Sequence, residues 1–396
     1  MSEEIQSEHA NAIAVFDKVK RTKLVFGDDS SLRSGELAKE LGLSHVLLVT
    51  DSGLVQAGHA ASVADSLKEA GIKVTLFDQV IENPTTDCVE KAKNAAADSG
   101  VDSFIGLGGG SSMDTAKGAN FLLTNGGSMH DYWGVDKASK DMLPLIVIPT
   151  TAGTGSECQS FALISDSKTH QKMACGDSKA AAKIAILDPK LTLSQPRNVT
   201  VCTGVDAIAH SVETAVTKKK NDLSFLFSRE AFKLLLPNFI KVINCPDDLT
   251  ARGSMLLGAA MAGCAIEASM LGAAHSLANP LTAHYGIVHG QAVGMMLPHV
   301  IRFNTKVSEC ERAYKELMDA GRIEYNQGSD NAGDKLAEYL LNLLKEVGIP
   351  LKLRSVIPDK SMFPLLAEEA ASQWTANFNP RLVSEIEMKE IYLEAY

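Results

Sequence analysis

Histidines gather in one apolar stretch of the sequence, residues 272–304. Four of the chain's ten histidines lie in it: His275, His284, His289 and His299. Because Gly, Ala and Pro surround them with almost no charge nearby, their ring nitrogens need partners inside the protein. A bound metal ion is one such partner, and the backbone carbonyl groups of an ordinary core are the other. The stretch alone leaves both interpretations open.

An earlier segment, TGVDAIAHSVETAV, adds Asp206 and His210 four residues apart. On a helix this spacing places both side chains on one face. A carboxylate and an imidazole, joined by histidines from a second segment, form a mixed nitrogen and oxygen set that suits Zn²⁺ or Fe²⁺. Thr203 and Asp206 also match a capping box, so Asp206 could instead cap a helix. Capping explains neither His210 nor the histidines downstream.

The composition is that of an ordinary globular protein long enough for two or more domains. The chain has 396 residues, of which 45% are hydrophobic and 22% charged. Its formal net charge of −10 argues against nucleic acid or an anionic membrane as a partner. The N-terminus, MSEEIQSEH, lacks the features of a signal peptide. Seven scattered cysteines without a C-x-x-C pair suggest no disulfide framework, so we expect a reducing cytoplasm.

One apolar run, residues 255–274, is nearly long enough to span a bilayer. Glu267 lies inside it, and a charge there is costly in lipid. Its Gly and Ala content suits close packing between helices. We therefore expect a buried helix that leads into the histidine stretch, and no membrane.

The first half of the chain alternates between apolar runs and helical patterns. Strands are expected at residues 23–27, 45–50, 73–77, 103–107, 143–149 and 183–187, and helices at 34–41, 55–70 and 86–99, with a short helix or arm within 1–20. Such alternation predicts an open parallel sheet with helices on both faces.

The strand at 103–107 runs into a glycine loop, GGGSS, at residues 108–112. Glycines let a backbone approach a ligand closely, and a helix N-terminus favours an anion. The loop matches neither G-x-G-x-x-G nor a Walker A loop. A tight turn capped by Ser111 or Asp114 is the alternative, but three consecutive glycines favour a phosphate site. The strand at 143–149 leads into a second polar loop, at 150–157, and loops at such strand ends form the ligand crevice of open sheets.

From about Ser194 the pattern changes to long helical segments. They are expected at 204–217, 224–243, 249–274, 290–304, 307–320, 331–347 and 360–372, with no strand pattern after Leu193. We therefore predict an α/β domain over residues 1–193 and an all-helical domain over residues 194–396.

Four motifs together resemble the iron-containing (group III) alcohol dehydrogenases. They are GGGSSMDTAK, PTTAGTGSE, DPKLTLSQPRNVTVCTGVDAIAHSVE and the spacing of His275 and His289. The resemblance runs from about residue 23 to residue 381 and implies a Rossmann-like dinucleotide-binding α/β domain followed by an all-α domain, the dehydroquinate synthase-like fold. It also implies hydride transfer between a small alcohol or aldehyde and NAD(H), with the substrate oxygen on a metal ion.

The resemblance carries site residues onto this sequence. It implies that the metal ligands are Asp206, His210, His275 and His289, holding Fe²⁺ or, as the alternative, Zn²⁺. The implied cofactor-binding residues are Asp51, Asn83, Gly108, Gly109, Gly110, Ser111, Ser112, Asp114, Thr150, Thr151 and Lys172. An acid at Asp51 would accept a hydrogen bond from a ribose 2′-hydroxyl and repel a 2′-phosphate, which favours NAD.

The sequence departs from the family at Asn279. Many members carry a histidine there, four residues after the third ligand, and an asparagine cannot transfer protons. Asn279 is therefore predicted to line the substrate pocket. His284 is the nearest titratable candidate for proton transfer, and water or the cofactor ribose are the alternatives. His299 is expected to be structural.

The sequence as a whole predicts a cytoplasmic, metal-dependent alcohol dehydrogenase or aldehyde reductase that forms a homodimer or larger homo-oligomer. One alternative is a lyase of the dehydroquinate synthase type, which would need several cations for a polyanionic substrate, whereas residues 275–304 offer only Arg302. The other alternative is a metal-binding protein without enzymatic activity.

Overall fold

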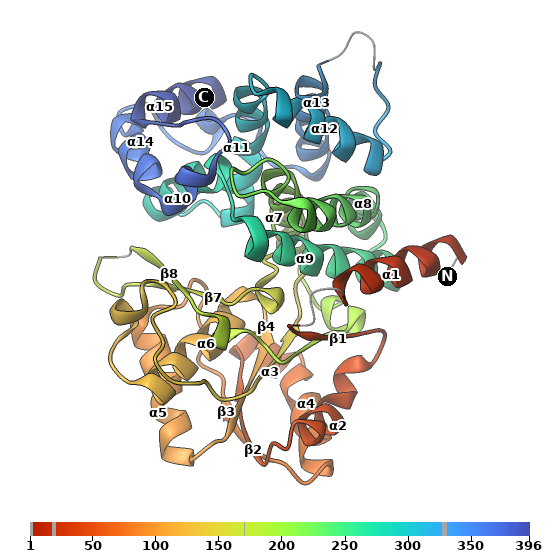
Figure 1. The fold of residues 1–396 in the computed structure, drawn as a ribbon, viewed down its shortest axis with the longest axis vertical. Coiled ribbons are helices and arrows are strands. Elements are labelled where there is room, and N and C mark those ends of the chain that lie inside the picture. The colour runs from red at the N-terminus through yellow and green to blue at the C-terminus, as the bar shows by residue number, and fades with distance from the viewer. Residues whose placement is uncertain (1–2, 18–20, 170, 327–330) are drawn as a thin grey trace. The chain divides into compact units, whose positions relative to one another are not determined.

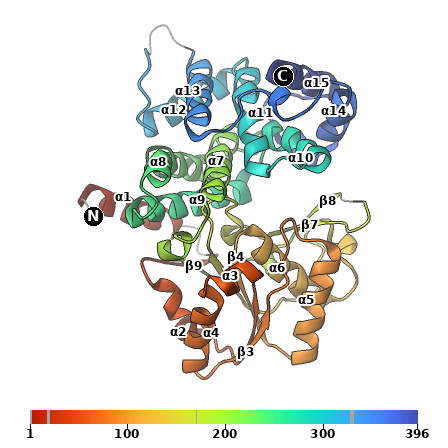
Figure 2. The same cartoon turned by 180° about the vertical axis from the view of Figure 1, so that it is seen from behind.

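The computed structural model describes residues 3–17, 21–169, 171–326 and 331–396 of the chain. It divides into two compact units, Met1–Gln195 and Pro196–Tyr396 (Figures 1 and 2).

The N-terminal unit is built on a parallel sheet of six strands. Their order across the sheet is β1 (Lys23–Phe26), β9 (Ile184–Leu187), β6 (Leu145–Pro149), β4 (Ser103–Gly108), β2 (His45–Val49) and β3 (Lys73–Phe77). Every residue of the four inner strands is buried, as expected for strands covered on both faces. The open parallel sheet predicted from the sequence is confirmed.

Helices cover both faces of this sheet (Figure 1). They are α2 (Ser34–Glu40) and α4 (His59–Glu69) on one face, and α5 (Thr86–Ser99) and α6 (Gly110–Asn125) on the other. Because successive strand residues point to opposite faces, Leu48 and Ile105 pack in the first core, whereas Leu47 and Phe104 pack in the second. The two cores fix the strand ends from which the polar loops emerge.

The helix expected over residues 55–70 is two helices, α3 (Ser52–Gln56) and α4. Gly58 separates them with a φ of 84°, a left-handed conformation that glycine adopts without steric cost. Helix α1 (Glu3–Phe16) fulfils the expectation of a short helix near the N-terminus.

A second, smaller sheet in the N-terminal unit was not predicted. It contains β5 (Gly134–Val135), β8 (Lys172–Gly176) and β7 (Phe161–Ser165), in that order. Strands β7 and β8 form an antiparallel pair whose inner residues, such as Ile164 and Met173, pack against α6. These strands are short and lack clear alternation, so their pairing depends on contacts with α6 that the local sequence does not reveal.

The C-terminal unit consists of helices and contains no strand among its described residues, as the sequence predicted. Its helices are α7 (Arg197–Thr214), α8 (Asp222–Asn244), α9 (Leu249–Ser269), α10 (Ala273–Tyr285), α11 (His289–Asn304), α12 (Ser308–Ala320), α13 (Ala332–Val347), α14 (Phe363–Ser372) and α15 (Glu385–Ala395). The sequence analysis missed α10 and α15.

The helix expected over residues 249–274 ends earlier than predicted. Helix α9 stops at Ser269, Met270 adopts a left-handed φ of 70°, and a new helix begins at Ala273. This break places His275 in the first turn of α10 rather than after the end of a long helix.

Helix α9 is the only described helix long and apolar enough to span a membrane. Of its most apolar window, 89% is buried inside the protein. Such burial is characteristic of the central helix of a packed core, which is the role expected from the sequence.

Candidate metal centre and cofactor loops

Three helices of the C-terminal unit bring imidazole rings to one buried carboxylate. Helix α7 carries Asp206 and His210 on one face, and Asp206 Oδ1 lies 3.5 Å from His210 Nε2. Helix α10 places His275 Nε2 3.3 Å from the same oxygen, and α11 places His289 Nε2 3.8 Å from it. Asp206 lies in the middle of α7, which begins at Arg197, so the capping interpretation of Asp206 is wrong.

The donor set fits a divalent metal ion. Ligand atoms of Asp206, His210 and His275 lie within 4.8 Å of one another, and all three residues are buried. In a tetrahedral site with bonds of about 2.1 Å, neighbouring ligand atoms are about 3.4 Å apart. The separations from Asp206 to the three rings are close to this value, and one carboxylate with three imidazoles suits Fe²⁺ or Zn²⁺.

The electrostatics of the cluster also favour a cation. Although burial opposes ionisation, the neighbouring His210 and His275 hold the pKa of Asp206 well below its usual range. Burial likewise disfavours a charged His275, but the carboxylates of Glu213 and Asp206 raise its pKa to about 9. A metal ion binds the deprotonated ring and supplies the positive charge that these carboxylates stabilise.

Close packing of α11 on α7 brings His289 to the site. Helix α11 begins at His289, and a Cβ on the next residue, Gly290, would collide with the backbone carbonyl group of Cys202 on α7. Gly290 therefore permits this close approach, and Gly294, four residues further along α11, does the same where it meets Val205 of α7.

The glycine loop has the geometry of an anion site. Gly108 ends β4 with a φ of 143°, and a Cβ there would also lie 2.5 Å from the Ser112 hydroxyl oxygen. The N-cap of α6 is Gly109, and no described side chain caps it. The alternative of a turn capped by Ser111 or Asp114 is therefore wrong, and no described side chain competes with an anion for the first N–H groups of α6.

Most of the predicted cofactor residues lie together at the carboxyl ends of neighbouring strands of the main sheet. Strands β2, β4 and β6 are neighbours and parallel, so their carboxyl ends lie side by side. Asp51 follows β2, the glycine loop follows β4, and Thr150 follows β6, where its N–H donates to Gly108 O at 3.0 Å. Thr151 lies beside Gly109. Asp51 also caps α3 by accepting from Leu54 N at 3.0 Å.

Two further predicted cofactor residues, Asn83 and Lys172, lie near one another around the small sheet. Asn83 has a left-handed φ of 51°, and the next residue, Pro84, accepts a hydrogen bond from Ser165 N at 2.9 Å. Ser165 pairs with Lys172 across β7 and β8. This places Asn83 and Lys172 close to a common strand end.

Asp114 is held by protein partners. Its Oδ1 accepts from the Ser156 hydroxyl at 2.6 Å and its Oδ2 from Leu163 N at 3.1 Å. The fully buried Lys117, one turn further along α6, donates to Ser156 O and Phe161 O. These bonds tie α6 to the second polar loop and to β7. They give Asp114 a bracing role and do not support the cofactor contact expected from the sequence.

His284 is not brought to the metal cluster. Nine residues after His275, it lies on the opposite side of α10 and about 13 Å further along the helix axis. Its Nε2 pairs with Glu369 on α14 at 2.9 Å. Nearness in sequence suggested proton transfer by His284, but the helical periodicity separates the rings of His284 and His275.

Asn279 lies one turn after His275 on the same face and donates to Gln373 Oε1 at 3.2 Å. His299 is buried, and burial lowers its pKa to about 4, in keeping with a structural role.

The sequence analysis missed two buried acids. Glu213 follows His210 by three residues on α7, and its carboxylate bonds to His275 Nδ1 and accepts from Ala274 N at 2.7 Å. The spacing H-x-x-E on a helix was a signal for it. Glu157, in the second polar loop, is 1% exposed, and burial raises its pKa to about 7.

Comparison with known proteins gives the family. Residues 21–189 match the model of the iron-containing alcohol dehydrogenases, and residues 200–396 match that of the C-terminal part of the Fe-containing alcohol dehydrogenase family. The chain belongs to the iron-containing alcohol dehydrogenase family. The resemblance seen in the sequence is confirmed.

Relatives in this family match over nearly the whole chain. The NAD-dependent methanol dehydrogenase of Bacillus methanolicus is 31% identical over 371 residues, which cover 94% of this chain and 97% of that protein. The lactaldehyde reductase of Escherichia coli (strain K12) is 30% identical, with 90% and 94% covered. The crystal structure of a 1,3-propanediol oxidoreductase superposes with a TM-score of 0.91 at 30% identity, covering 94% of this chain and 98% of that one. The predicted fold class is confirmed.

Replacing Glu157 by Gln should change how stability depends on pH. A carboxyl pKa of about 7 in the folded protein exceeds the ordinary glutamate pKa of 4.5, so the folded state binds more protons between these values. Its contribution is therefore fully present below pH 4.5 and is lost as the pH rises through 7. The loss amounts to about 3 kcal/mol at pH 8.

Urea denaturation of the two proteins from pH 4 to pH 8 tests this expectation. Relative to Glu157→Gln, the wild type should lose stability with rising pH, whereas the exposed control Glu82→Gln should follow the wild type. Parallel curves for wild type and Glu157→Gln would contradict it.

Replacing His284 by Ala should leave catalysis almost unchanged, because the ring lies away from the cluster and pairs with Glu369. We expect kcat within about twofold of wild type and the same pH profile, since loss of a true acid–base group costs about 10²–10⁴-fold. Steady-state rates from pH 5 to pH 10 with equal metal content provide the measurement. A flattened profile near neutrality would restore His284 to the mechanism.

Proposed function

We propose that this protein is an NAD(H)-linked, metal-dependent alcohol dehydrogenase or aldehyde reductase that acts on a small alcohol or aldehyde. The convergence of three imidazole nitrogens on the buried Asp206 carboxylate is the observation that carries the proposal. Its family membership and the names of its relatives, which include an NAD-dependent dehydrogenase and an aldehyde reductase, support the same reaction.

Asp206, His210, His275 and His289 would hold Fe²⁺, the metal of the family's name, with Zn²⁺ as the alternative. A divalent ion bound there supplies a Lewis acid for an alcohol or carbonyl oxygen. The four side chains carry one negative charge among them, so the site with its ion keeps a net positive charge. Burial of Asp206 and His275 excludes water and strengthens that charge's effect.

In the N-terminal unit, the loop at residues 108–112 and the N-terminus of α6 would take the pyrophosphate of the cofactor. Asp51 Oδ1 caps α3, and its second oxygen, Oδ2, would accept a ribose hydroxyl. Thr150, Thr151, Asn83 and Lys172 would line the rest of the cofactor site. In this assignment residues 1–193 bind the dinucleotide and residues 194–396 hold the metal.

Asn279 and Gln373 would contact the substrate, because Asn279 shares the face of α10 that carries His275. Neither amide transfers protons. Solvent or the cofactor ribose would therefore carry the proton that the reaction releases or consumes.

We further propose a homodimer or larger homo-oligomer in the cytoplasm. The seven cysteines form no disulfide with one another, and six of them are buried or half-buried, which suits a reducing compartment. Light scattering coupled to size-exclusion chromatography measures the oligomeric state directly.

Two other functions are less well supported. A lyase of the dehydroquinate synthase type would also use NAD and a metal ion, but its reaction would cause no net oxidation of NADH. A metal-binding protein without activity would have no use for the glycine loop at the sheet edge.

Replacing His289 by Ala should remove one of four ligands and lower both metal content and turnover. NADH oxidation with a panel of small aldehydes should be measurable in the metal-loaded wild type and at least about 10²-fold slower in the variant, because the group that polarises the carbonyl is lost. Metal content by mass spectrometry and a circular dichroism spectrum accompany the rates. Full activity in the chelator-treated wild type would contradict the proposed metal dependence, and aldehyde-independent NADH turnover would contradict the reaction.

Replacing Asp51 by Ser should relax the choice of cofactor. Serine keeps an oxygen that can cap α3 but removes the negative charge that repels a 2′-phosphate. The ratio of kcat/KM with NADPH to that with NADH should rise about tenfold or more, which corresponds to about 1.4 kcal/mol. The melting temperature serves as a control for the cap. A wild type that already prefers NADPH would show that Asp51 does not face the ribose.

A further inference from the structure

Glu213 lies in the last turn of α7 and is almost completely buried, with 3% of its surface exposed. Its two oxygens bond to neighbouring residues of α10: Oε2 to the Nδ1 atom of His275, and Oε1 to Ala274 N at 2.7 Å. A buried carboxylate is costly unless hydrogen bonds compensate it. Both compensating groups belong to the first turn of the helix that carries the third predicted metal ligand.

We propose that Glu213 is a positioning residue for the metal site, which fixes both the tautomer and the orientation of His275. The inference rests on the proposed metal centre. By accepting from Nδ1–H, the carboxylate leaves the proton on that nitrogen and leaves the Nε2 lone pair for the metal. His275 Nε2 indeed lies toward Asp206 Oδ1, at 3.3 Å.

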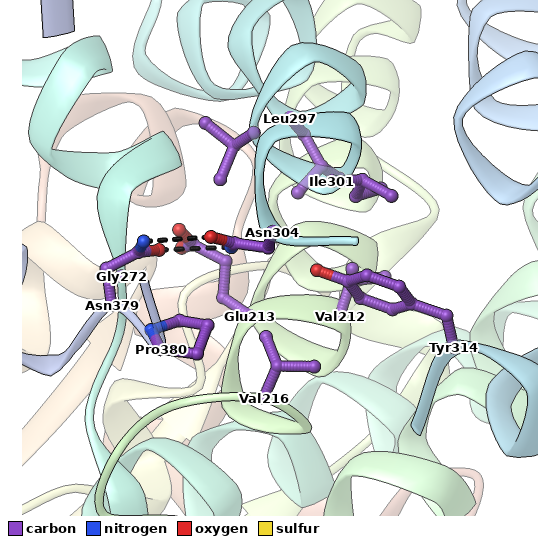
Figure 3. Close-up of a pocket in the computed structure, with 11 residues that line it drawn as sticks. Val212, Glu213, Val216, Gly272, Leu297, Ile301, Asn304, Tyr314, Asn379 and Pro380 are labelled. Carbon is purple, nitrogen blue, oxygen red and sulfur yellow. Dashed lines mark hydrogen bonds between the residues drawn. The ribbon is translucent and has the colours of Figure 1, made fainter. Parts of the chain in front are cut away.

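A buried pair of amide side chains, Asn379 and Asn304, lies beside Glu213 at the same helix start (Figure 3). Asn379 Oδ1 accepts from Ala273 N at 3.3 Å and from Asn304 Nδ2 at 3.1 Å. Asn379 Nδ2 donates in return to Asn304 Oδ1 at 2.9 Å. Asn304 is the last residue of α11, the helix that begins with His289. Glu213 and the two amides thus connect α7, α10 and α11, the three helices that carry the four predicted ligands.

The two acceptors leave little room for a side chain at the helix start. A Cβ on Gly272, the N-cap of α10, would lie 3.1 Å from Asn379 Oδ1 and 3.2 Å from Glu213 Oε1. Beside these atoms a small cavity, lined by Val216, Ile301 and Tyr314 among others, has space for about one water molecule (Figure 3). The carboxylate of Glu213 is held in place by its bonds to Ala274 N and His275 Nδ1.

The substitution Glu213→Gln distinguishes a role in positioning His275 from a role in capping α10. The amide oxygen of Gln can still accept from Ala274 N, so the cap of α10 is retained. Its NH₂ group donates instead of accepting, and it favours the His275 tautomer whose proton lies on Nε2. That tautomer cannot bind a metal through Nε2 until the proton has moved. A residue that only caps the helix would leave metal binding unchanged in this variant.

The experiment measures the dissociation constant of Co²⁺ for the full-length, metal-free protein by competition with a chromophoric chelator. We expect Glu213→Gln to bind Co²⁺ about 10–100-fold more weakly and to show a changed visible Co²⁺ spectrum. Gly272→Ala keeps the carboxylate but crowds it, and we expect a smaller loss in the same direction. Glu369→Gln is the matched control, because it changes the other histidine–glutamate pair of α10, and we expect wild-type affinity and spectrum.

The outcomes distinguish the two proposals. If the wild type binds no Co²⁺, the metal centre itself is refuted. If the wild type binds and a folded Glu213→Gln variant binds equally well with the same spectrum, the positioning role is refuted. If Glu213→Gln does not fold, as judged by circular dichroism, Gly272→Ala decides: wild-type affinity there refutes the role, and weakened affinity with an unchanged melting temperature supports it.

Discussion

The structure of the C-terminal unit depends on one buried carboxylate, that of Asp206. Removing such a charge from water is unfavourable unless positive charge or hydrogen-bond donors surround it. Here three imidazole rings lie 3.3–3.8 Å from its oxygen. Helices α7, α10 and α11 must therefore approach closely, and Gly290 and Gly294 allow α11 to reach α7.

Two buried acids, Asp206 and Glu157, show how strongly the neighbouring groups control the ionisation of a carboxyl group. Asp206 and Glu157 are both almost fully buried, with 5% and 1% of their surface exposed. Asp206 lies among three imidazoles, so its pKa is lowered, whereas Glu157 has one carboxyl oxygen without a hydrogen-bond partner among the described residues, and burial raises its pKa to about 7. Burial acts in the same direction on both groups, and their neighbours decide the result. The same environment that keeps Asp206 ionised is the one that suits a cation.

The strand order of the N-terminal unit brings together loops that are separated in the sequence. Three parallel neighbours, β6, β4 and β2, end at one edge, so loops that are separated in the sequence lie side by side there. The backbone bond from Thr150 N to Gly108 O joins two of these loops directly. Lys117 and Asp114 then fasten α6 to the second polar loop, which keeps the helix N-terminus facing the edge. The buried polar contacts of Lys117 and Asp114 thus help to hold the glycine loop in position.

The sequence by itself determined those features that depend on the spacing of residues close together in the chain. The pair Asp206 and His210, the glycine run at 108–110 and the buried strands are visible because helical and strand periodicities act over a few residues. Family resemblance added the roles of His275 and His289. Only the tertiary structure decided what depends on distant partners: the break at Met270 that starts α10, the small sheet packed on α6, the pairing of Asp114 with Ser156 and Leu163, and the contact between Glu213 and His275. His284 shows the difference most clearly. It is near His275 in sequence, but the turn of the helix directs it to Glu369, because a side chain's direction follows from the periodicity of its helix and its partner from the packing of the chain.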